Sequence, residues 1–333
     1  MAACSLLTVS LLLSSLFLPA LSTTFTLTNS CAYTVWPGLL SSAGTPTLDT
    51  TGFALAPGES RAVEAPSAWS GRLWARTGCG YDSNGRFSCG TCDCGSGAME
   101  CAGGGAAPPC SLAEFTLAGS GGNDFYDVSL VDGYNIAMAV LPQLADGAAA
   151  ADGAGCAATG CSADLNGPCP ADLRVSGPDG AGIACKSACE AFGKPEDCCS
   201  GDFGTPAACR PSASSMFFKN ACPRAYSYAY DDATSTFTCA SGTAGYLLVF
   251  CPTTTAIASL KSTVGVTNSS PALPVVNNTV SNLGRSRDSG SGWPYAPSSS
   301  HASTSSASSP ITLAVVTAFT WHFITRRHWL PPS

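Results

Sequence analysis

The chain has 333 residues, a formal net charge of −7, 35 glycines and 19 cysteines. The acidic balance argues against nucleic acid as a partner, because phosphate recognition needs a basic surface. All three histidines (His301, His322 and His328) follow the last cysteine. The cysteine-rich region therefore cannot use a His-dependent catalytic triad or a His-ligated metal, and we expect neither a metal nor a cofactor.

The first 22 residues are predicted to be a secretory signal peptide. Residues 6–18 form an apolar run, and Ala20 and Ser22 are the small residues that signal peptidase requires before its cleavage site. The run is too short to make a good membrane anchor, so we place cleavage after Ser22.

The cysteines predict a disulfide framework. Cys4 lies in the predicted signal peptide, and the other eighteen cysteines lie between Cys31 and Cys251. An even number of cysteines in a secreted chain is typical of disulfide pairing. A zinc site built from cysteines alone, suggested by the spacing of Cys89 and Cys92, is the less favoured alternative.

Alternating apolar and polar residues predict short strands separated by turns. Phe25, Leu27 and Val35 share one face of the first predicted strand, and Thr24 and Thr26 share the other. Similar patterns predict strands near residues 73–77, 113–117, 127–131, 136–140, 236–239 and 246–250. Long amphipathic helices are not expected, which favours a mainly β fold, either a sandwich or a barrel.

Two segments are too poor in large apolar residues to fold without disulfides. Residues 156–222 carry nine cysteines, and a short helix over residues 183–192 would place Cys185 and Cys189 one turn apart. Residues 79–110 form a second, Gly-rich segment with several cysteines. In both segments disulfides are expected to stabilise the fold by ~2–4 kcal/mol each.

The composition changes after Cys251. Residues 253–310 are rich in Ser, Thr and Pro and are predicted to be a disordered stalk, with N-glycosylation sites at Asn268 and Asn277. Residues 311–333 contain an apolar run, and we interpret them as the signal for a glycosylphosphatidylinositol (GPI) anchor. A single transmembrane helix and an unprocessed tail are the alternatives.

Several motifs then resemble one family. Residues 85–94 read GRFSCGTCDC, which is similar to the thaumatin signature G-x-x-x-C-x-T-G-D-C. Further matching stretches are YTVWP at residues 33–37, LWART at 73–77, FYDVSLVDGYN at 125–135 and CPRAYSY at 222–228. Over residues 24–252 the chain resembles the plant thaumatin-like proteins, pathogenesis-related group 5, including the osmotin type.

The resemblance implies a mainly β fold for residues 23–252. That fold is a flattened β-sandwich of about eleven strands, with a disulfide-rich subdomain at about residues 156–222 and a small loop domain at about residues 78–110. It also implies eight disulfides: Cys31–Cys251, Cys79–Cys89, Cys94–Cys101, Cys156–Cys239, Cys161–Cys222, Cys169–Cys185, Cys189–Cys198 and Cys199–Cys209. Cys92 and Cys110 depart from the family pattern, and we expect them to form a ninth bond, Cys92–Cys110, rather than two free thiols.

The resemblance also implies an acidic ligand-binding cleft. Its residues here are Arg72, Glu114, Asp127, Asp132 and Asp231, although Asp232 is not separable from Asp231 by sequence. Clustered carboxylates repel one another, so at least one of their pKa values should rise. The alternative is that the three aspartates only end strands and cap turns.

We expect a monomeric extracellular plant defence protein, held at the outer face of the plasma membrane by a lipid anchor, that binds β-1,3-glucan or a related wall polysaccharide. Tyr226, Tyr228 and Tyr230 share one parity and are interpreted as a packed strand face in preference to a sugar platform. Enzymatic activity is not the favoured reading. The alternatives are a weak endo-β-1,3-glucanase, with Glu114 as general acid and Asp127 as its partner, and an antifungal protein that perturbs membranes.

Overall fold

The computed structural model describes residues 22–144, 156–242 and 244–253. The predicted signal peptide up to residue 21, nearly all of the predicted stalk with Asn268 and Asn277, and the C-terminal tail lie outside the described residues. Ser22, which we placed at the end of the signal peptide, is the first residue of strand β1. Among the described residues, no helix has the length and apolar character needed to cross a membrane.

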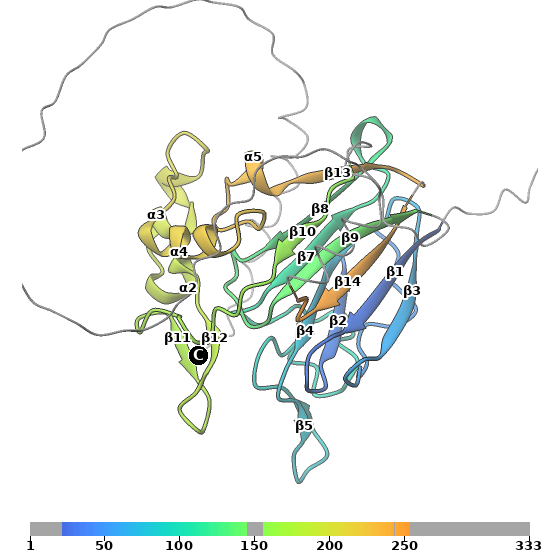
Figure 1. Ribbon diagram of the computed structural model, residues 1–333, viewed down its shortest axis with the longest axis horizontal. Coiled ribbons are helices and arrows are strands. Elements are labelled where there is room, and N and C mark those ends of the chain that lie inside the picture. The colour runs from blue at the N-terminus through green and yellow to red at the C-terminus, as the bar shows by residue number, and fades with distance from the viewer. Residues whose placement is uncertain (1–21, 145–155, 243, 254–333) are drawn as a thin grey trace, which may run out of the picture. The chain divides into compact units, whose positions relative to one another are not determined.

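Two five-stranded sheets dominate the described part of the chain (Figure 1). The first has the strand order β10-β9-β14-β1-β3, and the second has the order β13-β8-β7-β4-β2. The first sheet consists of β1 (Ser22–Asn29), β3 (Ser60–Pro66), β9 (Met138–Leu144), β10 (Thr159–Cys161) and β14 (Ala244–Phe250). The second consists of β2 (Trp36–Ser41), β4 (Ser70–Arg76), β7 (Leu112–Thr116), β8 (Asn123–Ser129) and β13 (Phe237–Ala240).

The two sheets pack face to face and enclose an aromatic core. The ring centroids of Phe25 on β1 and Phe115 on β7 lie 4.6 Å apart, and those of Tyr126 on β8 and Tyr246 on β14 lie 5.1 Å apart. Large rings on alternate positions of each strand therefore fill the space between the sheets. The mainly β sandwich predicted from the sequence is confirmed.

The first strand ends earlier than the sequence pattern predicted. Asn29 is buried, and its amide donates to the carbonyls of Tyr33 and Leu55 while its Oδ1 accepts from the Cys31 amide. These bonds turn the chain out of the sheet after Asn29, and Tyr33 is left 49% exposed. The alternating pattern that continues to Val35 therefore does not mark a strand beyond the end of β1 at Asn29.

The small loop domain covers Trp74 and Arg76 at the end of β4. It contains the short paired strands β5 (Gly80–Tyr81) and β6 (Phe87–Ser88). The Trp74 indole donates to the Cys92 carbonyl at 3.1 Å. The Arg76 guanidinium, fully buried, donates to the carbonyls of Trp36, Pro37 and Met99. A buried cation whose donors are matched by carbonyls fixes this loop domain on the sheet.

The disulfide-rich subdomain combines a short ladder with small helices, which Figure 1 shows gathered together. Its elements are β11 (Arg174–Ser176), β12 (Gly182–Cys185), α2 (Ala188–Phe192), α3 (Pro195–Cys198), η3 (Gly201–Phe203) and α4 (Ala213–Ala221). The helix predicted over residues 183–192 is wrong in its first half, because Cys185 lies in β12 and pairs with β11. The helix begins only after Ser187, whose hydroxyl accepts from the Glu190 amide.

Nine disulfides join the eighteen cysteines of the described residues. They are Cys31–Cys251, Cys79–Cys89, Cys92–Cys110, Cys94–Cys101, Cys156–Cys239, Cys161–Cys222, Cys169–Cys185, Cys189–Cys198 and Cys199–Cys209. These are the pairs that the sequence analysis expected. Cys31–Cys251 joins the loop after β1 to the end of β14, and Cys161–Cys222 joins β10 to the end of α4.

Candidate functional site

Three of the expected site residues lie in one row across adjacent strands. Arg72 on β4 is the register partner of Glu114 on β7, and Glu114 is the partner of Asp127 on β8. Their neighbours along the chain (Leu73, Ala113, Phe115 and Val128) are buried in the core between the sheets. Because side chains alternate along a strand, the row projects from the opposite face of the second sheet. We call Arg72, Glu114 and Asp127 the charged row.

The small loop domain borders the Arg72 end of the charged row. A Cβ atom added to Gly105 would lie 3.5 Å from the Arg72 guanidinium, so the backbone of this loop runs close to the side chain. Two residues after Arg72 and on the same face of β4, Trp74 is completely buried and packs with Cys92, Cys110 and Leu112. The accessible part of this face therefore begins at Arg72, which is itself partly exposed.

Asp127 is the most buried member of the row. The residue is 7% exposed, and its Oδ2 atom has no hydrogen-bond partner. Burial raises the pKa of this carboxyl well above its ordinary value, and the negative charges of Glu114 and Asp232 raise it further. Asp127 thus keeps its proton to a higher pH than an exposed aspartate does, and in that form it can donate a hydrogen bond.

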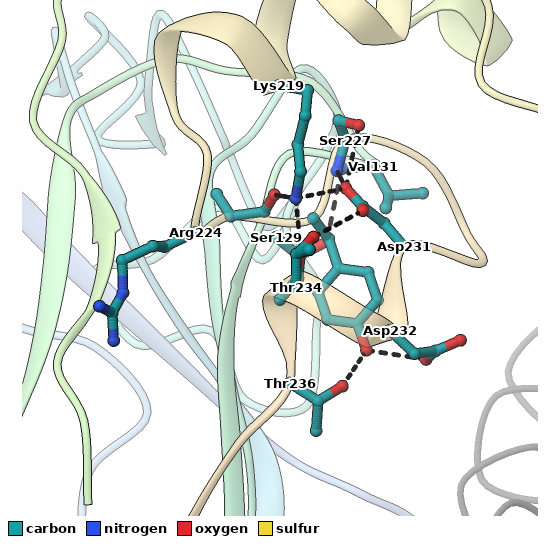
Figure 2. Close-up of polar contacts among 12 residues, drawn as sticks. Ser129, Val131, Lys219, Arg224, Ser227, Asp231, Asp232, Thr234 and Thr236 are labelled. Carbon is teal, nitrogen blue, oxygen red and sulfur yellow. Dashed lines mark hydrogen bonds and ion pairs between the residues drawn. The ribbon is translucent and has the colours of Figure 1, made fainter. Parts of the chain in front are cut away.

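Tyr226 connects Asp232 to Asp127 of the charged row. The Tyr226 hydroxyl donates to Asp232 Oδ1 at 2.8 Å and is also hydrogen bonded to Thr236 Oγ1 (Figure 2). Burial raises the Tyr226 pKa, and the charges of Asp127 and Asp232 raise it further. Two backbone bonds hold the Tyr226 segment against the end of β8, from the Tyr226 amide to the Val128 carbonyl and from the Leu130 amide to the Tyr226 carbonyl.

Asp231 has a different role from its neighbour. Its Oδ2 atom forms an ion pair with Lys219 Nζ at 2.9 Å and accepts bonds from the amide and hydroxyl of Ser227, both at 3.1 Å (Figure 2). Its Oδ1 atom accepts from the Thr234 hydroxyl. The Asp231 carboxylate is therefore occupied by donors of the protein itself, whereas Asp232 is the aspartate whose charge acts on Asp127.

Asp132 lies in the turn that follows β8, where three parts of the chain meet. Its carbonyl accepts from the Cys110 amide at 2.8 Å. The next residue, Gly133, has a φ of +88°, and a Cβ atom there would lie 2.7 Å from Pro109 Cβ and 2.8 Å from the Cys185 carbonyl oxygen. Only glycine fits this turn, which fixes the backbone of Asp132 beside both the loop domain and the subdomain.

The three tyrosines do not form a strand face, so that prediction is wrong. Tyr226 is buried, whereas Tyr228 and Tyr230 are partly exposed in the irregular segment before α5 (Asp232–Ser235). Burial raises the pKa values of Tyr228 and Tyr230, and the charge of Asp232 contributes to both shifts. Two accessible rings thus lie near the carboxylate of Asp232.

Sequence analysis did not identify Lys219, Ser227 or the Tyr226 hydroxyl as parts of this site. Lys219 lies in α4, just before the matching stretch at residues 222–228 but outside it, and no local pattern links it to Asp231. Figure 2 also shows that the Arg224 side chain points away from this group, so the nearby positive charge is supplied by Lys219. No group of three or more His, Cys, Asp or Glu suited to a metal ion occurs in residues 22–144, 156–242 and 244–253.

Comparison with known proteins identifies the family. Residues 29–252 match the model of the thaumatin family. Thaumatin-like protein 1 of Prunus persica is 55% identical over 227 residues, which cover 68% of this chain and 89% of the relative. A glucan endo-1,3-beta-glucosidase of Prunus avium is 49% identical over 229 residues, which cover 69% of this chain and 90% of the relative. Among solved structures, a thaumatin-like xylanase inhibitor aligns at 22% identity over 68% of this chain and 99% of its own, with a TM-score of only 0.37. The chain belongs to the thaumatin family.

Proposed function

We propose that this extracellular defence protein binds β-1,3-glucan, or a related wall polysaccharide, on the face of the second sheet that carries the charged row. The observation that carries the proposal is Asp127 Oδ2, a buried oxygen without a hydrogen-bond partner beside Glu114 and Asp232. A relative that is 49% identical is named as a glucan endo-1,3-beta-glucosidase, which supports a glucan as the ligand.

The chemistry of the row suits a polyhydroxylated ligand. An unsatisfied buried oxygen costs free energy, on the order of 1–3 kcal/mol. A rotation of the Asp127 carboxyl that brings Oδ2 to the surface would let a sugar hydroxyl remove that cost. Arg72 supplies donors, Glu114 and Asp232 supply acceptors, and Asp127 changes from donor to acceptor with its protonation state. The partly exposed rings of Tyr228 and Tyr230 offer apolar faces on which sugar rings can stack.

Weak glucanase activity is the second candidate, because Glu114 and Asp127 are cross-strand partners. A glycosidase uses one protonated and one ionised carboxyl. The raised pKa of Asp127 makes it the better general acid, and Glu114 then acts as base or nucleophile. These roles are the reverse of those we assigned from the sequence.

A sedimentation assay tests both candidates. The full secreted chain is incubated with insoluble β-1,3-glucan, and bound protein and released reducing sugar are both measured. Glu114→Gln and Asp127→Asn are compared with Glu64→Gln, which changes a carboxylate on β3 of the other sheet. We expect the wild type and Glu64→Gln to sediment with the glucan and the two row variants to bind more weakly.

The outcomes separate the candidates. Sugar release that disappears in both row variants would make the protein a glucanase, and binding without release would make it a glucan-binding protein. Equal binding by all four proteins would remove the charged row from the site, and no sedimentation of the wild type would overturn the proposal.

We also propose that the protein remains at the outer face of the plasma membrane. The Ser/Thr-rich residues 253–310 would form the stalk, and a GPI anchor would replace residues 311–333. The extracellular setting follows from the disulfide-rich thaumatin domain, and the anchor is the part of this proposal that needs a test.

A further inference from the structure

The ion pair between Lys219 and Asp231 connects the disulfide-rich subdomain to the acidic site. Lys219 lies near the end of α4, one turn before Cys222, which is bonded to Cys161 on β10. Its side chain is 17% exposed, and the side chain of Asp231 is 11% exposed. An ion pair this well shielded from water is geometrically demanding, because each charge depends on its partner for solvation.

The Lys219 ammonium contacts three residues of the 225–235 segment. It donates to the Ala225 carbonyl at 3.2 Å and to the Ser235 hydroxyl at 2.9 Å, in addition to the ion pair with Asp231. The Ala225 carbonyl immediately precedes Tyr226, and Ser235, which is fully buried, lies in α5. All three donors of the ammonium therefore have acceptors, and these acceptors lie on both sides of Asp232 in the chain.

The segment between these contacts carries Asp232, whose charge acts on Asp127, and Tyr226, whose hydroxyl is bonded to Asp232. Ser227 donates to Asp231 through its amide and its hydroxyl, which closes the loop from residue 227 to residue 231. The loop ends at Asp232, whose carboxylate accepts from the Tyr226 hydroxyl. Lys219 therefore has contacts to the chain on each side of Asp232, and Figure 2 draws the contacts of this group as dashed lines.

Asp232 needs such support whenever Asp127 loses its proton, because the two carboxylates then have the same charge. The negative charge of Asp232 and that of Glu114 both act on Asp127. Carboxylates that repel one another would move apart into solvent if their backbone were free to do so. An ammonium ion bound to the neighbouring Asp231 and to the two flanking segments opposes that movement.

We propose that Lys219 is a positioning residue for the acidic site: from α4 it fixes the 225–235 segment so that Asp232 and the Tyr226 hydroxyl stay beside Asp127. The function of that site rests on the glucan binding proposed above. Lys219 itself does not touch the ligand. The disulfide-rich subdomain thereby supports one side of the site, and the other residues of the site lie on the second sheet.

Three single variants of the full secreted chain test this proposal. Lys219→Met keeps the length of the side chain but removes the charge, Lys219→Arg keeps the charge, and Lys194→Met is the matched control at an exposed lysine of the same subdomain. Glucan binding is one readout. The second is the pKa of the Asp127 carboxyl, followed by NMR in protein labelled at its aspartate side chains, which requires no ligand.

We expect Lys219→Met to bind glucan on the order of tenfold more weakly, the loss expected for one charged hydrogen-bond network, and to have a lower Asp127 pKa because Asp232 moves away. Lys219→Arg should largely retain both properties, and Lys194→Met should match the wild type. If Lys219→Met leaves Asp231 as an uncompensated charge and fails to fold, the double variant Lys219→Met/Asp231→Asn removes both charges and is measured in its place.

The two readouts separate this proposal from the glucan proposal. If a folded Lys219→Met protein keeps the wild-type Asp127 pKa and the wild-type affinity, Lys219 has no positioning role. If the wild type does not bind glucan but Lys219→Met still lowers the Asp127 pKa, the proposed ligand is wrong and the positioning role stands. A variant that is only less stable, with both properties unchanged, would also overturn the proposal.

Discussion

Glu114 and Asp127 lie directly opposite each other on β7 and β8, yet their surroundings differ. Glu114 is partly exposed, whereas Asp127 is 7% exposed and has one oxygen without a partner. Directly opposed residues have Cβ atoms about 4.5–5.5 Å apart, so two ionised carboxylates there repel strongly. The pKa of Asp127 is raised by burial and then by the charges of Glu114 and Asp232, so Asp127 keeps its proton to a higher pH than an exposed aspartate does.

Replacing Asp127 by asparagine should stabilise the fold at neutral pH. The folded pKa of Asp127 lies above the unfolded value, so ionising it in the folded state costs stability as the pH rises above about 4. Asparagine has no such cost. We expect Asp127→Asn to raise the melting temperature at pH 7, by about 2–4 °C for each kcal/mol recovered, and to leave it nearly unchanged at pH 3.5.

Asp124→Asn is the control for this prediction, because Asp124 is also buried on β8 but is fully bonded. Its carboxylate accepts from the Ala118 amide and from the hydroxyls of Ser241 and Tyr246. Asn has one acceptor oxygen fewer, so Asp124→Asn should lower the melting temperature at pH 7. If Asp127→Asn instead lowered it by a similar amount, Asp127 would be a structural residue.

The sandwich could be predicted because local patterns carry it, whereas Arg72, Glu114 and Asp127 were expected as site residues from the family resemblance. Period-2 alternation marks β7 and β8, and it also places Glu114 and Asp127 on the faces opposite Phe115 and Val128. The early end of β1 could not be predicted in this way, because it depends on bonds from Asn29 to Leu55, 26 residues away. Apolar and polar residues continue to alternate past Asn29 although the strand has ended there.

The separation of Asp231 from Asp232 shows the same limit within the site. Adjacent aspartates are equivalent in sequence, and a lysine in a different element decides between them by pairing with one. The Tyr226, Tyr228 and Tyr230 pattern failed for a related reason, since an irregular segment bridged to β8 can repeat every second residue without being a strand. The positions of these aspartates and tyrosines depend on contacts between distant parts of the chain, which the local sequence pattern does not contain.

Glu100 should make the fold sensitive to acid. Burial raises its pKa, but hydrogen bonds from Thr51, Thr50 and Gly52 outweigh that effect, so the folded pKa lies below the ordinary value. Its contribution is therefore present above the unfolded pKa and is lost as the pH falls below about 4. We expect Glu100→Gln to lower the melting temperature at pH 6, with a loss of less than about 1 kcal/mol in the free energy of unfolding because the group is exposed. This difference should shrink towards pH 3, and an equal loss at both pH values would contradict the assignment.

The anchor proposal predicts release by phosphatidylinositol-specific phospholipase C. Cells that express the full chain should lose surface protein to the medium after treatment, because the enzyme cleaves the lipid from a GPI-linked protein. A variant truncated after residue 310 should be found in the medium without treatment. Full-length protein that stays on the cells after treatment would favour a transmembrane tail.

The Cys92–Cys110 bond should stabilise the loop domain against the second sheet. The two Cα atoms lie 5.3 Å apart, both residues are buried, and the Cys92 carbonyl accepts from the Trp74 indole. Closing a loop between residues 18 apart is worth ~3 kcal/mol in the chain-entropy model. We expect Cys92→Ser/Cys110→Ser to fold with a lower melting temperature and with altered tryptophan fluorescence, because the indole loses its fixed neighbour.

Thiol counting checks the pairing itself. Denatured wild-type protein, secreted and processed, should show no reactive thiol, whereas Cys92→Ser alone should expose one, from Cys110. Two thiols in the wild type would mean that the pair is open. If the bond were open in the wild type, the double substitution would remove no bond. The tryptophan fluorescence of the wild type and the double variant should then be the same, because Trp74 would pack against Leu112 and Cys101 in both proteins. Thiol counting in the wild type and Cys92→Ser therefore tests the presence of the bond, and the double variant tests its effect on the loop domain.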